Sequence, residues 1–191
     1  MTTLFVNACA WEHSRTHALC DEYLNGIDEV ETVNLFELDL QPLNWARLAE
    51  REELQRSGDW GDSMFDLAKQ FATADEIVIG APYWDLSFPA VLKIYIELVT
   101  VNGIAFHYTE EGMPEGLCRA KRLVYISTAG GPGSKANFGY EYLKGITRLY
   151  GIPEVHQIFA EMLDVVGMDV DAIMNEAKDE IHRLKASLPA L

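Results

Sequence analysis

Short apolar runs recur along the chain at nearly regular intervals, and turn formers or polar residues bound each of them. The runs are rich in β-branched and aromatic residues and too short for helices, as is typical of strands buried on both faces of a parallel sheet. One further run, richer in polar residues, is typical of a partly exposed strand. The predicted strands are residues 4–8, 31–38, 76–81, 121–128 and 156–160.

Longer stretches between these runs predict helices. In the fourth of them, Ser87 is the expected N-cap and Pro89 the expected first-turn residue. Strands that alternate with helices predict an α/β fold with a doubly wound parallel sheet, in one domain that spans residues 1–191. The charged helix at 45–57 is interpreted as a solvated helix or as a lid. The predicted helices are residues 14–25, 45–57, 61–73, 91–99, 136–150 and 168–188.

The central strand, 76–81, ends in a sharp break. Pro82 stops the strand, and two large aromatic residues, Tyr83 and Trp84, follow before the next helix. In open α/β sheets, ligands bind at the carboxyl ends of strands. The two rings are therefore either anchors of the loop or walls of a site for a flat ligand, and the convergence of further loops on the same edge favours the second interpretation.

The loop after the first strand, residues 9–16, leads directly into a helix. Ser14 and Thr16 supply two hydroxyls there, and Arg15 lies between them. Backbone N–H groups and the dipole at a helix N-terminus favour a dianion, so the loop is a candidate phosphate cradle. The alternative is that Ser14 only caps the helix.

A glycine-rich loop follows the strand 121–128. Glycines at the carboxyl end of a strand let the backbone approach a planar ligand closely. The loop is not a nucleotide-phosphate loop, because no Gly-Lys-Ser/Thr follows in register. Such loops are also common as simple turns, so this signal is weak alone. Its residues are Ser127, Thr128, Gly130 and Gly131.

Composition and charge narrow the class of protein. Residues of hydrophobic type make up 49% of the 191 residues, which indicates a folded globular chain. The formal net charge of −15 argues against nucleic acid and anionic membranes as partners. No apolar run is long enough to span a membrane, and the start of the chain lacks a basic signal-peptide region, so we expect a cytoplasmic protein. The three cysteines fit a reducing compartment, and neither they nor the scattered histidines have metal-ligand spacing.

Three segments carry a resemblance to a known family: GAPYWDLSFPAVLK at residues 80–93, GIAFHYTEEG at 103–112 and STAGG at 127–131. They resemble the flavodoxin-like, FMN-dependent NAD(P)H:quinone oxidoreductases and azoreductases, and they occur in the same order as in that family. The resemblance implies a three-layer sandwich around a five-stranded parallel sheet with strand order 2-1-3-4-5.

The resemblance also implies FMN as cofactor, with NADH or NADPH as electron donor and a quinone or azo compound as acceptor. Hydride transfer would occur at flavin N5, so no side chain is expected to be catalytic, and no metal is implied. Two departures stand out: the serine usual near residues 8–10 is absent, and Asp85 stands where the family commonly has Asn. The implied FMN-binding residues are Ser14, Arg15, Thr16, Pro82, Tyr83, Trp84, Asp85, Leu86, Ser127, Thr128, Gly130 and Gly131.

The segment 103–112 helps to build a dimeric substrate pocket in the enzymes that the chain resembles. His107 and Tyr108 are therefore candidates for lining that pocket, with contribution from a partner subunit or simple packing as the two interpretations. The helix at 90–100 is apolar around most of its circumference, so it must be buried on more than one side. A homodimer or coverage by neighbouring helices would provide that burial, and we predict the homodimer.

Two other functions compete with this interpretation. The pattern Cys9-x5-Arg15-Thr16 is that of protein tyrosine phosphatases, in which a thiolate at a helix N-terminus attacks a phosphate. Against it, the loop has no glycine, Glu12 adds a negative charge, and no Asp-Pro general-acid segment follows at the expected place. The other alternative is a flavodoxin-like FMN-binding module that transfers electrons without turnover, against which the segment 103–112 argues.

Overall fold

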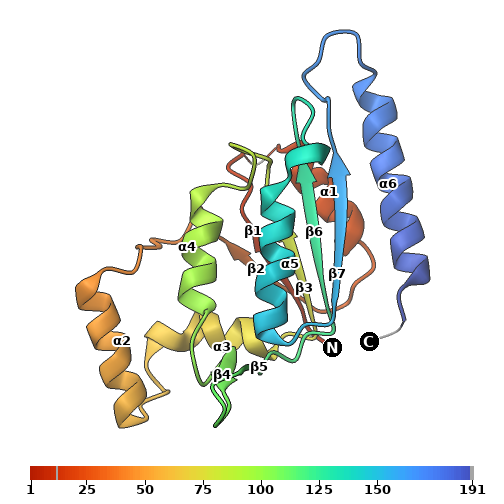
Figure 1. The fold of residues 1–191 in the computed structure, drawn as a ribbon. Coiled ribbons are helices and arrows are strands. Elements are labelled where there is room, and N and C mark those ends of the chain that lie inside the picture. The colour runs from red at the N-terminus through yellow and green to blue at the C-terminus, as the bar shows by residue number, and fades with distance from the viewer. Residues whose placement is uncertain (12, 190–191) are drawn as a thin grey trace.

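A five-stranded parallel sheet forms the centre of the molecule in the computed structural model, which describes residues 1–11 and 13–189 (Figure 1). The strand order is β2-β1-β3-β6-β7, which is the predicted order 2-1-3-4-5. The carboxyl ends of the five strands therefore lie along one edge. The strands are β1 (Thr3–Asn7), β2 (Val30–Asn34), β3 (Glu76–Gly80), β6 (Arg122–Thr128) and β7 (Glu154–Ala160).

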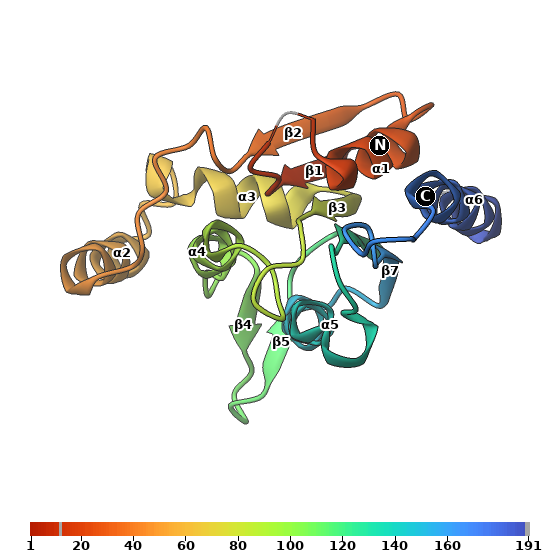
Figure 2. The ribbon, with the colours of Figure 1, turned by 90° about the horizontal axis from the view of Figure 1, so that it is seen from above.

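Helices cover both faces of the sheet, which gives the predicted three layers (Figure 2). Side chains on β1 alternate between the layers: Leu4 and Val6 pack toward α3, α4 and α5, whereas Phe5 packs toward α1 and α6. Because both faces are covered, all five residues of β3 are buried. The helices are α1 (Arg15–Leu24), α2 (Trp45–Ser57), α3 (Asp66–Thr73), α4 (Ala90–Val99), α5 (Phe138–Tyr150) and α6 (Val170–Ser187).

Several element boundaries differ from the predicted ones because local capping decides them. Strand β2 ends at Asn34 rather than at residue 38, because a turn begins there. The helix predicted over 61–73 starts with a short 3₁₀ turn, Ser63–Phe65, which the side chain of Asp62 caps. A second 3₁₀ turn, Ser134–Ala136, precedes α5, so that helix begins two residues later than expected.

Two segments lie outside the three layers. Helix α2 stands away from the rest of the molecule, and none of its residues is buried (Figure 1). Its Gln55 side chain donates a 2.9 Å hydrogen bond to the carbonyl of Asn102. Residues 103–116 form a small antiparallel hairpin that packs against the carboxyl end of α5. Its strands are β4 (Phe106–Tyr108) and β5 (Pro114–Gly116).

Candidate functional site

The loop after β3 contains a reverse turn with an uncommon backbone. Asp85 and Leu86 both have positive φ, 49° and 66°. The N–H and C=O groups of Trp84 and Ser87 exchange hydrogen bonds of 3.0 and 2.8 Å across them. This is the two-residue turn that normally selects Asn-Gly, because both central residues are left-handed. Leu86 is thus held in a left-handed backbone conformation that leucine disfavours, and such strain is concentrated at functional sites.

The expected cap of α4 was wrong for the same reason. Ser87 closes the turn through its backbone. The N-cap is instead Pro89, which makes no side-chain cap hydrogen bond, and the helix begins at Ala90. Proline at this position needs no capping partner for its own nitrogen, since it has no N–H.

Hydrogen bonds join the three predicted loops at the carboxyl edge of the sheet. The Tyr83 N–H donates to the carbonyl of Thr128 at 2.9 Å, and the Thr128 hydroxyl lies 2.7 Å from that of Thr16. The Phe138 N–H donates to the carbonyl of Leu86 at 3.0 Å. The loop after β1, the turn after β3 and the loop after β6 are thus one connected structure.

The α1 N-terminus is arranged as a capped helix end. Ser14 is its N-cap, and the Ser14 side chain accepts a hydrogen bond from the His17 N–H at 3.3 Å, so the capping interpretation is confirmed. The first turn of α1 contains no acidic residue, which leaves the helix dipole available to an external anion. Thr16 is fully buried, whereas Arg15 is exposed, and its guanidinium reaches the carbonyl of Leu163 and the carboxylate of Asp164.

The aromatic residues of the turn have different environments. Tyr83 is a loop anchor, because its ring meets Phe159 edge to face at a centroid distance of 5.8 Å and its hydroxyl donates to the carbonyl of Ala136. Trp84 is 43% exposed, and Leu86 and Phe138 are 52% and 60% exposed. The surface beside the turn is therefore apolar and open, as a flat ligand requires.

The glycine-rich loop presents backbone rather than side chains. Ser127 is fully buried, so its hydroxyl lies beneath the loop surface. A Cβ built on Gly131 would meet nothing within 4 Å, whereas a Cβ at Gly130 would collide with the carboxylate of Asp164. At Gly133 it would lie 2.9 Å from the ring of Phe159. The loop is thus packed on one side and open at Gly131, where a ligand could approach the backbone.

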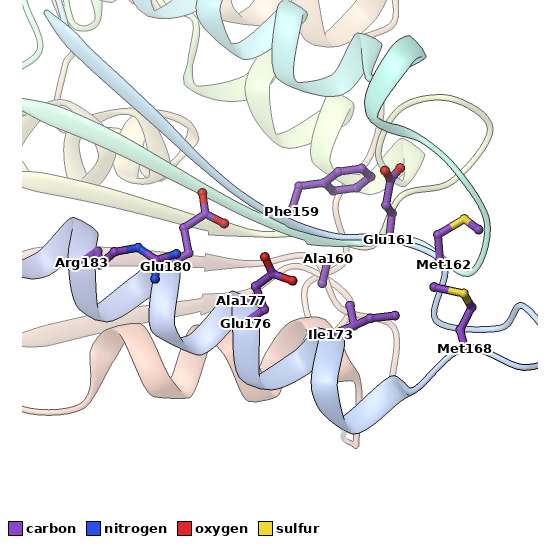
Figure 3. Close-up of a pocket in the computed structure, with 10 residues that line it drawn as sticks. All are labelled: Phe159, Ala160, Glu161, Met162, Met168, Ile173, Glu176, Ala177, Glu180 and Arg183. Atoms are coloured by element: carbon purple, nitrogen blue, oxygen red, sulfur yellow. The ribbon is translucent and has the colours of Figure 1, made fainter.

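Two hollows adjoin this edge of the sheet. One, of about 530 Å³, lies beside the phosphate-loop candidate at the ends of β1 and β2, with Cys9, Trp11, Asn34 and Phe36 among its lining residues. The other, of about 320 Å³, lies between β7 and α6 and includes the side chains in Figure 3. It faces α6 and does not include the turn after β3, so we place the site on the three loops.

Cys9 does not have the properties of a phosphatase nucleophile. Its thiol is buried and faces the carbonyl of Gly80 at 3.8 Å. Burial raises the pKa of Cys9 to about 11, although a hydrogen bond with Ser14 opposes that shift. The thiol is therefore neutral at pH 7, whereas a nucleophile needs the thiolate. One of the objections raised from the sequence concerned Glu12, which lies outside the described residues.

His107 and Tyr108 do not lie with the three loops in one chain. Both are on β4, in the hairpin at the carboxyl end of α5, and that helix end is at the amino edge of the parallel sheet. The His107 ring nitrogen Nε2 lies 2.8 Å from the Glu115 carboxylate across the hairpin, and Tyr108 is exposed. Their predicted role in a substrate pocket therefore requires a second chain.

Sequence reasoning missed the segment after β7. Glu161, Met162 and Asp164 contact the glycine-rich loop or Arg15, and Met162 has a positive φ of 70°. The only signal in the sequence is a pair of acidic residues at the end of a predicted strand, and acidic residues are common in exposed loops.

Comparisons with known proteins agree with this architecture. A family model described as a flavodoxin-like fold matches residues 1–184. The FMN-dependent NADH:quinone oxidoreductase 2 of Clostridium acetobutylicum is 39% identical over 173 residues, which cover 84% of this chain and 85% of that protein. The FMN-dependent NADH:quinone oxidoreductase of Clostridium beijerinckii is 39% identical over 177 residues, with 87% and 88% covered.

Solved structures show the same fold at lower identity. An azoreductase from Bacillus anthracis superposes with a TM-score of 0.85 at 21% identity, with 98% of this chain and all of that chain covered. An FMN-dependent NADH-azoreductase from Bacillus anthracis, solved in complex with FMN, gives 0.80 at 21% identity, with 97% of each chain covered. The chain therefore belongs to the flavodoxin-like family, in the group of FMN-dependent NADH:quinone oxidoreductases. The resemblance and the fold predicted from the sequence are confirmed.

Proposed function

We propose that the chain is an FMN-dependent NADH:quinone oxidoreductase that also reduces azo compounds. The observation that carries the proposal is the joining of three loops at one edge of the sheet, each suited to a different part of FMN. Its relatives are named for FMN and NADH, and its fold neighbours include azoreductases. The exposed surface at Trp84, Leu86 and Phe138 supports a flat acceptor.

The described residues fit FMN part by part. The N-terminus of α1, with Ser14 as cap and Arg15 at its first position, would hold the phosphate, since no acidic side chain of the first turn competes for it. The backbone of the turn at Asp85 and Leu86 would contact the polar edge of the flavin. The backbone at Gly131 leaves the space that a planar group needs. Thr16 and Ser127, both buried, support these loops from below.

When bound, FMN would supply hydride-transfer chemistry between NADH and a two-electron acceptor. The protein would bind and orient the FMN and the substrate, and its described side chains need not exchange protons with the substrate. The open apolar surface beside the turn is one site that donor and acceptor would use in succession, which implies ping-pong kinetics. The net charge of −15 repels both FMN and NADH, so binding depends on the local helix terminus.

We also propose that the active form is a homodimer with the sites at the interface. Helix α2 has no buried residue, and its Trp45 is 86% exposed, so the rest of one chain does not cover the apolar side chains of this helix. Helix α4 leaves Val91 and Ile94 only partly buried. A second copy would cover these surfaces and could bring its His107 and Tyr108 to the site.

One experiment tests both parts. The purified chain is mixed with FMN, passed through a gel-filtration column with light-scattering detection, and assayed for NADH oxidation with a quinone and with an azo dye. We expect retained flavin at about one FMN per chain, the mass of a dimer, and reduction that depends on FMN. A chain that retains no flavin would refute the cofactor, and a monomer at micromolar concentration would refute the dimer. Retained flavin without turnover would favour the electron-transfer module.

A further inference from the structure

The segment that follows β7, residues 160–164, runs beside the glycine-rich loop and is hydrogen-bonded to it. The Ala129 N–H donates to the carbonyl of Ala160 at 2.8 Å, which continues the pairing of β6 with β7. Leu163 and Asp164 then donate back to the carbonyls of Ala129 and Gly130 at 3.2 and 2.8 Å. Residues 160–164 therefore hold the glycine-rich loop, which would lie against the flavin, through backbone hydrogen bonds. No sequence motif identifies this segment.

Asp164 connects this segment to the phosphate loop. Its Oδ1 accepts a hydrogen bond of 2.8 Å from Nη1 of Arg15, and the same nitrogen donates to the carbonyl of Leu163 at 3.3 Å. The other carboxylate oxygen fills the space where a side chain at Gly130 would be. One carboxylate thus contacts both loops that would hold FMN, and a side chain at residue 130 would displace it.

Glu161 fastens the second half of the glycine-rich loop. Its Oε2 accepts from the N–H groups of Gly133 and Ser134 at 2.6 and 2.8 Å. Although burial opposes it, these two backbone hydrogen bonds lower the pKa of Glu161, so the side chain is a carboxylate at neutral pH. Figure 3 shows Glu161 on the side of β7 away from α6, where the loop passes.

We infer that residues 160–164 are a brace for the cofactor site, in which Asp164 positions Arg15 beside the phosphate and Glu161 positions the loop against the flavin ring. The inference rests on the proposed function, because it assumes that the three loops hold FMN. Both carboxylates are positioning residues, since each acts through another group. The Arg15–Asp164 ion pair is largely exposed and so contributes little to stability. Its effect is therefore on cofactor binding.

The two carboxylates of the brace, Asp164 (the phosphate arm) and Glu161 (the ring arm), should affect different parts of the bound flavin. Asp164 acts through Arg15, so its removal weakens binding of FMN and leaves binding of riboflavin, which lacks the phosphate, unchanged. Glu161 acts on the ring side, so its removal weakens binding of both. A merely structural role for Asp164 would affect the two flavins equally.

The test is a fluorescence titration of apo-protein with FMN and with riboflavin. We expect Asp164→Ala to raise the Kd for FMN about 1.5- to 5-fold, which is the range for an exposed ion pair, at unchanged apo-protein melting temperature. Combined with Arg15→Ala, it should add nothing to the loss from Arg15→Ala alone. Glu161→Ala should raise both Kd values. Asp179→Ala on α6 and Glu154→Ala at the amino end of β7 remove the same charges away from the loops and serve as matched controls.

Each result decides the inference. Asp164→Ala with wild-type or tighter FMN binding, an equal loss for riboflavin, or a loss that adds to that of Arg15→Ala would overturn the phosphate arm. Unchanged binding in Glu161→Ala would overturn the ring arm. If the wild-type protein binds neither flavin, the proposed function fails and the inference with it. If the wild type binds FMN and the variants behave like their controls, only the brace is refuted.

Discussion

The two ends of the parallel sheet differ in how they treat polar groups. At the amino end, Glu76 is 1% exposed, and its carboxylate accepts hydrogen bonds from Thr3, Tyr23 and Arg122 at 3.1, 2.8 and 2.6 Å. At the carboxyl end, three non-glycine residues (Asp85, Leu86 and Met162) adopt left-handed backbone conformations, and the large apolar side chains of Trp84 and Leu86 are exposed. The buried carboxylate at the first end is satisfied within the chain, whereas the loops at the second end combine backbone strain with exposed apolar side chains.

This difference separates stability from function. A buried charge whose hydrogen bonds are all made within the chain stabilises one register of β3 against β6, because Glu76 and Arg122 are paired residues of the two strands. Strain and exposed apolar surface have no structural benefit in the free chain, so a ligand or partner is the reason for them. Substitutions at Glu76 and Arg122 should therefore change stability alone, and those in the loops at the carboxyl end should change cofactor binding.

The largest expected effect comes from Glu76→Ala. It leaves the Arg122 guanidinium buried without its partner, which typically costs about 3 to 5 kcal/mol of unfolding free energy. Urea unfolding of the apo-protein measures this loss. The FMN Kd of the fraction that remains folded should stay at the wild-type value, because the site lies at the opposite edge.

The double variant Glu76→Leu with Arg122→Met is the control for this prediction. It removes both charges and should recover part of the stability that Glu76→Ala loses, because the hydroxyls of Thr3 and Tyr23 still lose their acceptor. If Glu76→Ala is as stable as wild type, the ion pair is not structural. If it instead weakens FMN binding in the folded protein, the separation of the two ends is wrong.

Much of the fold could be predicted from the sequence, because a strand that is buried on both faces is apolar at nearly every position. The run at 76–81 is apolar throughout, as β3 is when helices cover both its faces. The errors are at ends that single side chains decide, such as the cap by Asp62 and the turn after Asn34. Capping competes with periodicity over one or two residues, and a hydrophobic pattern does not resolve that competition.

The site was less predictable than the fold. The three loops were recognisable because strand ends, hydroxyls and glycines are local signals. The left-handed turn was not, since Leu86 takes the second central position, where such a turn selects glycine. The acidic brace at Glu161 and Asp164 was missed because its partners are about 30 and 150 residues away in the chain. His107 and Tyr108 were recognised as candidates, but one chain does not bring them to the loops.

An intermediate effect is expected at Leu86. A β-branched residue is less tolerant of positive φ than leucine, so Leu86→Val should cost about 1 to 2 kcal/mol of unfolding free energy. It should also weaken FMN binding, because the backbone of this turn would contact the flavin. Urea unfolding and fluorescence titration measure the two effects on one sample.

Leu86→Gly separates backbone strain from the loss of the side chain. Glycine adopts this conformation freely but loses more entropy on folding, so its stability should lie within about 1 kcal/mol of wild type. FMN binding that survives Leu86→Gly and weakens in Leu86→Val would assign the role to the backbone. Equal weakening in both would assign it to the leucine side chain.

The smallest expected effect is at Cys9, which lies at the carboxyl edge but is buried, as Glu76 is at the amino end. Burial raises the pKa of Cys9 from an ordinary value of about 9 to about 11, so roughly 100-fold less thiolate is present at pH 7 than for a free thiol. Alkylation of Cys9 by iodoacetamide should therefore be slow at pH 7 and should accelerate as pH rises toward 11.

Cys9→Ser should keep FMN-dependent quinone reduction within about twofold of wild type, since the hydroxyl can donate to the Gly80 carbonyl as the thiol does. Mass spectrometry follows the alkylation, and NADH oxidation follows the activity. Rapid alkylation at pH 7, or aryl-phosphate hydrolysis that disappears in Cys9→Ser, would show a reactive thiolate and return the phosphatase interpretation.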